Sequence, residues 1–405
     1  MEISGLSGNE IYCLALKGFE PGEIVVGNSV FSLGIGGWFN TMGGMLAGGE
    51  VAEVTSLISE GRHAALERME NEARKQFARG ITGVITAVSA LGGYTEFLAQ
   101  GTAVSVESNE GGLFSTSASG IDLYCHLDAG YTPKGFVMGN VAYSLGLGRG
   151  ISSSFRRLVR GEVIELSQMY NEIRHLALDR IRREARSKGA NAVVDLCVET
   201  LYHHSTGTHE LIITGTASHY DRIPSFPLEV ITSELTGEEL WNMAKQEYVP
   251  MSLVTANSVC ALGVAQSIGT SFQAMGRGEL PNLTTLIYEA RENCLDRLRS
   301  EAERVGADRV IGNKLIIAEL QPGLLEILAI GTAVRKMEGT SPLTPELIPQ
   351  AVITDRETFF PGGRLTPDAE RFAVGVVPTT RRALGWLLFL VFACGYGIAV
   401  LYYNH

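Results

Sequence analysis

The chain has 405 residues, which is enough for two to four domains of about 100–150 residues each. Its formal net charge of −11 argues against a general nucleic-acid binder, because contact with phosphate backbones requires a basic surface. A hydrophobic fraction of 45% and a charged fraction of 19% indicate that most of the chain folds. The six cysteines include no C-x-x-C pair, so their spacing predicts neither a zinc site nor a disulfide framework, and thiols in a reducing compartment are expected.

A pattern of three anchors recurs three times along the chain. The first anchor is a strand-like run at residues 27–34, 139–146 and 256–263. The second is a helix start at Gly49, Gly161 and Gly278, and the third is a strand end at Gly101, Gly215 and Gly331. Successive copies of every anchor lie 112 to 117 residues apart, so we infer three diverged copies of one module.

Other features recur around these anchors. Upstream, the pairs Tyr12-Cys13, Tyr124-Cys125 and Trp241-Asn242 predict a further strand in each copy, with small buried side chains at Cys13 and Cys125. The helices share a Leu-acid-Arg motif at residues 66–68, 178–180 and 295–297. Glycine closes each helix, at Gly80, Gly189 and Gly306, with three more residues before it in the first copy. Two β-like runs then form a hairpin.

Each copy therefore predicts two strands, one main helix and a hairpin, which is an α+β fold with an antiparallel sheet covered by one helix. The predicted divisions are modules at 1–110, 119–221 and 228–337, a proline-rich linker at 338–382 and a transmembrane helix at 383–403. A core with a single helix is thin and leaves sheet edges open, so such a module is expected to need neighbours.

The chain resembles the YbjQ-like family of small bacterial proteins, which carries a heavy-metal-binding label. The resemblance rests on the strand at 139–146, the helix exit at 184–194 and the strand end at 215–217 of the middle copy. The first copy departs at its helix exit, and the third has Ala256 in place of the strand glycine. The resemblance implies dodecin-like α/β modules that assemble into pentameric rings. Tandem copies would then form stacked tiers, or instead lie side by side in one ring.

A glycine-rich loop separates the anchor strand from the helix in each copy. Apolar side chains in these loops would be exposed on an isolated module, so we predict that they form an oligomer interface. They are Trp38, Phe39, Met42 and Leu46 in the first copy, Phe155 in the second and Phe272 in the third. The arginines of the middle helix, among them Arg174 and Arg180, predict a solvated or ring-interface face, with an anion site as the alternative.

Few residues in the sequence are candidates for a metal or catalytic site. His203, His204 and His209 flank the second hairpin turn and predict a metal site, with a solvated polar hairpin as the alternative. His126 follows Cys125, and on a strand the two would point to opposite faces. No catalytic arrangement recurs in the three copies, so the chain is expected not to be an enzyme and to need no cofactor beyond a possible metal ion.

Residues 383–403 contain no charge and have the length of a bilayer core, about 30 Å, so they predict a transmembrane helix. Arg381 and Arg382 precede it and place the bulk of the chain on the cytoplasmic side. Trp386, Tyr402 and Tyr403 are expected in the interfacial belts. No secretion signal is expected at the N-terminus.

The sequence thus predicts a homo-oligomeric scaffold or cage anchored in a bacterial inner membrane, built of stacked five-fold rings. Its partners would be further copies of itself, the lipid bilayer and an unidentified membrane protein that it encloses or adjoins. The alternative is a protein that binds a metal or small ligand at subunit junctions. A third hypothesis is an enzyme whose active site is assembled between subunits.

Overall fold

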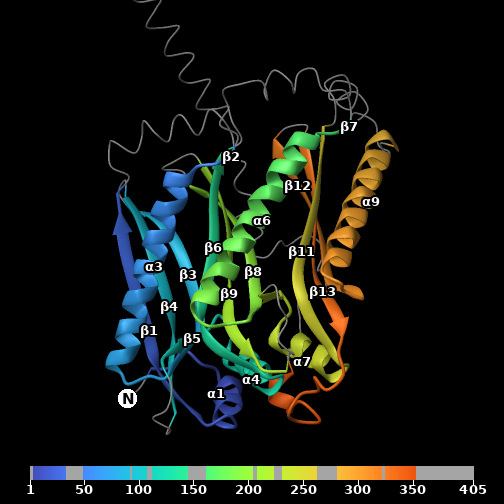
Figure 1. The fold of residues 1–405 in the computed structure, drawn as a ribbon. Helices are drawn as coiled ribbons and strands as arrows, with labels where there is room; N and C mark the ends of the chain where they lie inside the picture. Colours follow the sequence, from blue (N-terminus) through green and yellow to red (C-terminus); the bar gives the residue numbers. More distant parts are fainter. Residues whose placement is uncertain are drawn as a thin grey trace, which may run out of the picture. The chain divides into compact units, whose positions relative to one another are not determined.

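The computed structural model describes residues 3–32, 49–91, 94–106, 112–144, 161–203, 208–222, 230–261, 281–321 and 324–352. These residues belong to one compact unit. It contains three tandem α/β modules that repeat the same long elements in the same order, as the sequence predicts (Figure 1).

The elements of the three modules can be given in chain order. The first module consists of α1 (Gly8–Ala15), β1 (Phe19–Phe31), β2 (Gly49–Glu50), α3 (Ala52–Lys75), β3 (Gly80–Leu91) and β4 (Tyr94–Val106). The second consists of β5 (Phe114–Ser115), α4 (Gly120–Asp128), β6 (Tyr131–Ser144), β7 (Gly161–Glu162), α6 (Ile164–Ser187), β8 (Ala192–His203) and β9 (Thr208–Tyr220). The third consists of β10 (Ile231–Thr232), α7 (Gly237–Lys245), β11 (Tyr248–Ala261), α9 (Pro281–Arg304), β12 (Arg309–Gln321) and β13 (Leu324–Lys336), and a short η1 (Pro349–Ala351) follows.

The long strands of each module form an antiparallel sheet in which the last strand lies in the middle. The orders are β1-β4-β3, β6-β9-β8 and β11-β13-β12. Short strands tie neighbouring modules together. The strands β2 and β7, which precede the long helices, join the sheet of the following module, whereas β5 and β10 join the sheet of the preceding one.

The segment upstream of each anchor strand is a short helix, so the predicted extra strand is wrong. Cys13 lies in α1, Cys125 and His126 lie in α4, and Trp241 lies in α7. Ser7 and Thr236 begin two of these helices with capping boxes, in which a Glu three residues later bonds back to the cap. These caps satisfy amide groups at the helix start, which favours helix over strand. The predicted burial of Cys13 and Cys125 is confirmed.

The helix exit of the first module also differs from the prediction. The three long helices have equal length, and Phe77 of the first module stands where the others have Gly189 and Gly306. All three residues have positive φ, at 57°, 72° and 68° respectively. The first copy therefore has no insertion at this point. Gly80 instead begins β3, where the phenyl ring of Phe114 lies against its α-carbon.

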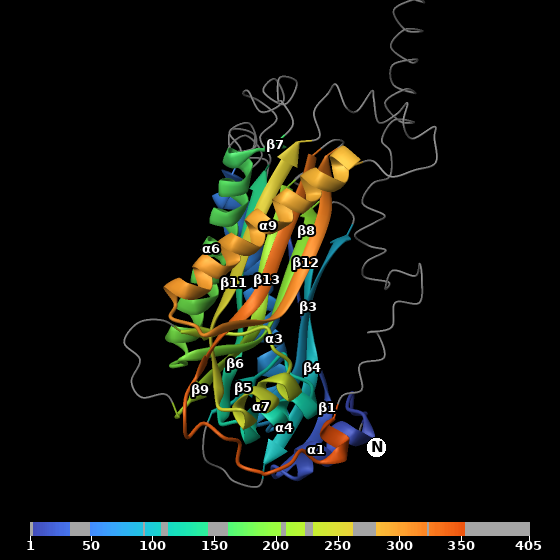
Figure 2. The same ribbon diagram turned by 90° about the vertical axis from the view of Figure 1, so that its right-hand side faces the viewer.

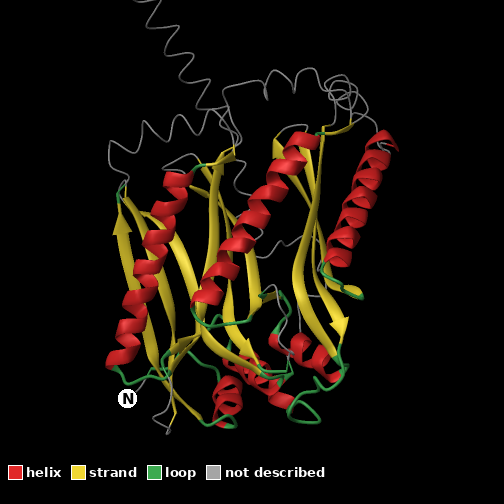
Figure 3. Ribbon diagram, in the orientation of Figure 1, coloured by secondary structure: helices red, strands yellow, loops and turns green. Residues whose placement is uncertain are grey.

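The three modules lie side by side, so that α3 and α6 are each followed by the sheet of the next module (Figures 1, 2 and 3). The core around α3 includes Phe136 and Met138 of β6, and the core around α6 includes Leu253 and Val259 of β11. A helix covered by apolar surface on two sides is buried over most of its circumference. This arrangement is the one in which copies within a chain share a single layer.

Residues 338–352, here called the terminal strap, run back across the short helices. Its η1 packs against α1 and α4, and Ala351 is buried. The strap is held at Asp128, whose carboxylate accepts hydrogen bonds from Lys17 of the first module, Trp241 of the third and Thr344 of the strap. The first part of the predicted linker is therefore packed on all three modules.

Within the described ranges, no helix is long and apolar enough to cross a bilayer. The predicted transmembrane helix at 383–403, with Arg381, Arg382, Trp386, Tyr402 and Tyr403, lies outside the described residues. So do the predicted interface residues of the glycine-rich loops, Trp38, Phe39, Met42, Leu46, Phe155 and Phe272.

Candidate functional site: the junction between modules

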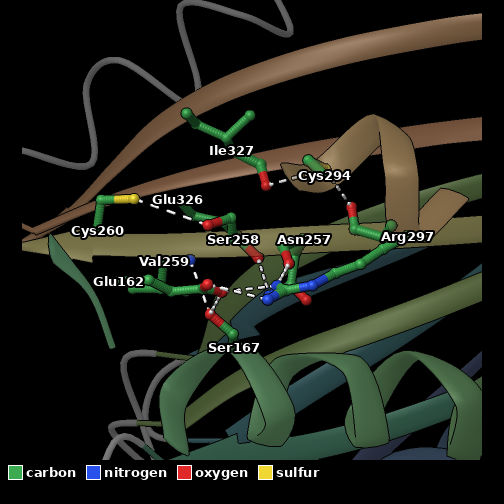
Figure 4. Close-up of polar contacts among 11 residues, drawn as sticks. Glu162, Ser167, Asn257, Ser258, Val259, Cys260, Cys294, Arg297, Glu326 and Ile327 are labelled. Atoms are coloured by element: carbon green, nitrogen blue, oxygen red, sulfur yellow. Dashed lines mark hydrogen bonds and ion pairs between the residues drawn. The ribbon is translucent and has the colours of Figure 1, made fainter. Parts of the chain in front are cut away.

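The most elaborate polar structure in the chain lies where one module meets the next. At the junction between the second and third modules, Arg297 of α9 reaches back to the short strand β7 (Figure 4). Its two terminal nitrogens donate to the two oxygens of Glu162 at 2.6 and 2.9 Å. Arg297 also donates to the carbonyl of Asn257 at 2.8 Å, so it fixes β7 and β11 together. A bidentate arginine-carboxylate pair gives both strength and geometric specificity.

Ser167 of α6 links the same carboxylate to the main strand of the third module. Its hydroxyl donates to Glu162 at 3.0 Å and accepts the amide of Val259 at 2.9 Å. The amide of Val163, just before α6, donates to the carbonyl of Val259 at 2.7 Å. The start of the second module's helix thus satisfies the outer edge of β11, an edge that would otherwise be left unpaired.

A buried ion pair lies deeper in this junction. Arg174 of α6 donates to Glu326 of β13 at 2.7 Å, and Asn257 donates to the same carboxylate oxygen at 3.1 Å. Both ionic side chains are more than nine-tenths buried. Separating the partners would leave an unpaired charge in the interior, which costs free energy. The pair therefore disfavours any other alignment of the two modules.

The junction between the first and second modules repeats most of this design at equivalent positions. Arg62 of α3 pairs with Glu210 of β9 at 3.0 Å, and Asn140 donates to Glu210 at 3.2 Å. The hydroxyl of Thr55 accepts the amide of Ala142 at 2.9 Å. Arg180 of α6 donates to Glu50 of β2 at 2.7 Å. Each of these residues lies 112 to 117 positions before its counterpart in the second junction.

The electrostatics of both junctions favour the ionised pairs. Burial acts to raise the pKa of Glu210, but the charge of Arg62 and the hydrogen bond from His203 outweigh it and hold that pKa below its usual value. Burial likewise opposes ionisation of Glu162, and the hydrogen bonds from Arg297 and Ser167 hold its pKa below the usual range. Both carboxylates are therefore charged at neutral pH and bound to arginine.

The short helices are joined by a matching contact. Glu10 of α1 accepts the first amide of α4, from Gly120, at 3.1 Å. Asp122 of α4 accepts the first amide of α7, from Gly237, at 2.9 Å. A Cβ on Gly120 would lie 2.7 Å from Glu10, and one on Gly237 would lie 2.6 Å from Asp122. These glycines are required because the preceding short helix approaches so closely.

The predicted metal-site histidines occupy one end of the second hairpin. His203 of β8 is buried and bonds to Glu210 at 2.8 Å, on the face of the sheet that meets α3. His209 precedes Glu210 on β9, so alternation turns it to the other face, where it stacks on Tyr143. His204 lies outside the described residues. No group of three His, Cys, Asp or Glu side chains suited to a metal ion occurs among the residues that the structure covers, and the metal site stays a prediction.

Sequence reasoning identified some of these residues and missed others. The repeated Leu-acid-Arg motif contains Arg180 and Arg297, and the predicted ring-interface face contains Arg174. The carboxylates Glu210 and Glu326 were missed, although they recur at the same distance from the strand end in each copy. The repeat pattern does not single out Asp128, because the equivalent positions in the other two modules hold Leu16 and Lys245.

Comparison with known proteins now assigns the family. The sequence profile of the YbjQ family, described as "Putative heavy-metal-binding", matches residues 19–107, 131–221 and 235–337. This chain belongs to the YbjQ family. The matched segments coincide with the three modules, so the predicted resemblance is confirmed as a threefold tandem arrangement.

Two kinds of relative stand out. The chain is 33% identical over 227 residues to the encapsulin nanocompartment protein of Mycobacterium tuberculosis, a match that covers 53% of this chain and 84% of that protein. It is 36% identical over 85 residues to a UPF0145 protein of Thermotoga maritima, covering 21% of this chain and 80% of the relative. A UPF0145 protein of Halorubrum lacusprofundi is 38% identical over 103 residues, covering 25% and 97% respectively. No solved structure matches the chain.

Proposed function

We propose that this YbjQ-family protein is a homo-oligomeric scaffold or cage, anchored at the cytoplasmic face of a bacterial inner membrane. The observation that carries the proposal is the repetition of the same junction twice within one chain. A protein that has kept two equivalent sets of buried ion pairs, hydroxyl links and short strands is built to place like modules next to one another.

The relatives support this proposal. The Mycobacterium tuberculosis relative is named an encapsulin nanocompartment protein, and the match to it spans more than two modules' length. None of the three relatives described above carries a name that states an enzymatic activity, and the expectation that this chain is not an enzyme stays a prediction.

The arrangement of modules bears on the form of the assembly. Modules of one chain lie side by side and share lateral junctions, which favours a ring in which all modules occupy one layer. Stacked tiers with one module per tier would require modules of one chain to meet end to end. We therefore propose the single-layer ring over the stacked five-fold rings that the family resemblance suggests.

Membrane anchoring is the second part of the proposal and rests on the uncharged run at 383–403 with Arg381 and Arg382 before it. An alkaline wash of membranes tests it, because an integral protein stays with the lipid. Replacing Val391 and Cys394 by arginine adds about 2.5–3.5 kcal/mol for each charge at the helix centre, and we expect the double variant to leave the membrane. A wild-type chain that the wash removes would refute the anchor.

The experiment for the assembly is the mass of the full-length chain in mild detergent, measured by light scattering. We expect a defined multiple of 43.6 kDa after subtraction of the detergent. A chain that stays monomeric at all concentrations would refute the scaffold. Cryo-imaging of native membranes should show rings or domes beside the bilayer and would reveal whether they enclose a membrane protein.

Metal binding is the second candidate, and the family description favours it. Metal analysis of protein purified without a histidine tag tests it. Stoichiometric metal that is lost when His203, His204 and His209 are replaced by alanine would establish it, and metal-free protein would end it.

A further inference from the structure

The first module presents a strand face that its counterparts bury. On β1, Ile24, Val26 and Val30 are 42% to 49% exposed. The equivalent residues are at most 8% exposed: Phe136, Met138 and Ala142 on β6, and Leu253, Thr255 and Val259 on β11. The helix of the preceding module covers those two strands. An exposed apolar face whose two equivalents are both covered is an incomplete junction.

The polar groups on this face match those of a junction as well. Glu96 lies opposite Val30, just as Glu210 lies opposite Ala142 and Glu326 lies opposite Val259. Instead of a buried arginine, the bond that Glu96 makes within the described residues is from the hydroxyl of Ser89, an exposed contact at 3.0 Å. Arg68 contacts the carbonyl of Asn28, as Arg180 and Arg297 contact their own strands, but it meets no carboxylate in the described part of the chain.

The third module presents the other half. Arg291 of α9 is the equivalent of Arg62 and Arg174, yet its side chain is 40% exposed. It bonds to its neighbour Glu292 and lies over the ring of Tyr288. The core around α9 contains residues of its own module alone, whereas the cores around α3 and α6 extend into the following module.

The short helices at the two ends of the chain are complementary in the same way. Gly8 begins α1 as Gly120 begins α4 and Gly237 begins α7, but no atom lies within 4 Å of a Cβ placed on Gly8. Glu239 of α7, the equivalent of Glu10 and Asp122, is exposed. In addition, β12 ends its sheet without a counterpart of the short strands that flank β3 and β8 in the structure's described part. By the repeat spacing, β5 and β10 correspond to residues 2–3, of which the structure describes Ile3.

We propose that the chain associates head to tail with a second copy of itself through a third junction of the same kind. In it α9 and β12 of one copy cover β1 and the N-terminal segment of the next, Arg291 pairs with Glu96, and Glu239 accepts the amide of Gly8. This inference rests on the proposed scaffold function and specifies its contacts. Three independent features agree: charge complementarity, uncovered apolar surface and continuity with two junctions already formed.

The geometry constrains the stoichiometry. A head-to-tail contact is heterologous, so repetition closes a ring or extends a filament. Every chain contributes three modules, so a closed ring of whole chains contains a multiple of three. A ring of five modules cannot be formed by this contact.

Charge reversal tests the junction in the full-length protein in mild detergent. Glu96→Arg and Arg291→Glu each place like charges opposite one another, and each should raise the dissociation constant at least about 100-fold. The double variant Glu96→Arg/Arg291→Glu should reassemble, because every junction then again joins opposite charges. Glu60→Arg and Arg304→Glu are matched controls, because their middle-module equivalents, Glu172 and Ser187, stay exposed with neighbours on both sides. The controls should keep the wild-type mass.

The possible outcomes distinguish failure of the third junction from failure of the proposed scaffold function. Wild-type protein that assembles while both reversals leave its mass unchanged would overturn the junction and leave the scaffold standing. Single variants that dissociate, with a double variant that stays dissociated, would also overturn it, because the loss would not come from this ion pair. Circular dichroism should show unchanged folding, since both side chains are partly exposed in the single chain. A monomeric wild type would refute the scaffold itself.

Discussion

Arg62 and Glu210 lie 148 residues apart in the sequence, yet their side chains meet at 3.0 Å between the helix of one module and the sheet of the next. Both are almost completely buried, at 1% and 0% exposure. Such a pair contributes little when compared with well-packed apolar residues, but breaking it is costly because one charge stays behind in the interior. It therefore selects one alignment of the modules.

Replacing Glu210 by alanine should destabilise the chain by about 3–5 kcal/mol, because Arg62 would be left buried and unneutralised. Glu96→Ala is the matched control, since Glu96 holds the same sheet position in the first module but is partly exposed. We expect a loss of at most about 1 kcal/mol there. Denaturant unfolding of dilute protein measures both. Equal losses at the two positions would contradict the assigned role of the junction.

Phe77 holds a backbone conformation that suits glycine, with φ of 57°, and its ring is 88% exposed. Phe77→Gly should stabilise the protein by about 1 kcal/mol, because the ring makes little contact to lose and the left-handed strain disappears. The converse change Gly189→Phe should destabilise it by a similar amount or more. Thermal unfolding measures both, and a lower midpoint for Phe77→Gly would show that the ring has a packing role.

Asp195 should make stability depend on pH near neutrality. Burial and the negative charge of Asp122 raise its pKa to about 7, against a hydrogen bond from Ser117 that lowers it. Because the folded-state pKa is raised, the folded chain binds the proton more tightly, and the stabilisation is complete below about pH 4 and is lost as the pH rises through 7. Unfolding curves between pH 5 and 8 should show falling stability. Asp195→Asn should flatten this slope, and an unchanged slope would place the titration elsewhere.

Asp128 should control the docking of the terminal strap. Burial opposes its ionisation, but hydrogen bonds from Lys17, Thr344 and Trp241 hold its pKa below the usual value. Its contribution is therefore present above about pH 4 and is lost as the pH falls through the lowered pKa. Asp128→Ala should cost about 3 kcal/mol or more and release the strap, because it removes several charge-assisted bonds.

Limited proteolysis would detect release of the strap as faster cleavage around residues 338–352. Glu338→Ala, at an exposed position where the strap begins, serves as the control and should leave the cleavage rate unchanged. Cleavage of the Asp128→Ala variant at the wild-type rate would mean that the other contacts of the strap, such as the packing of η1 and the bond from Lys245 to the carbonyl of Pro345, are enough to hold it.

The sequence shows which segments repeat, but it does not show which segments contact one another. Three modules, their long helices and their closing hairpins follow from anchors at constant spacing. The short helices were missed because an aromatic residue next to a cysteine also fits a buried strand. The spacing of Ser7 and Glu10 in the sequence does indicate a helix start. The junctions depend on register between segments 87 to 152 residues apart, which no local pattern encodes. Once the strand pairing is known, Arg62 and Arg174 become donors whose acceptors lie in the following module.

The modules all point the same way along the body. The short helices α1, α4 and α7 lie at one end, while β2 and β7 pair with the main strands at the other (Figure 1). The strap finishes against α1 and α4, at the short-helix end of the body. A ring of such units would be polar, with two chemically distinct rims.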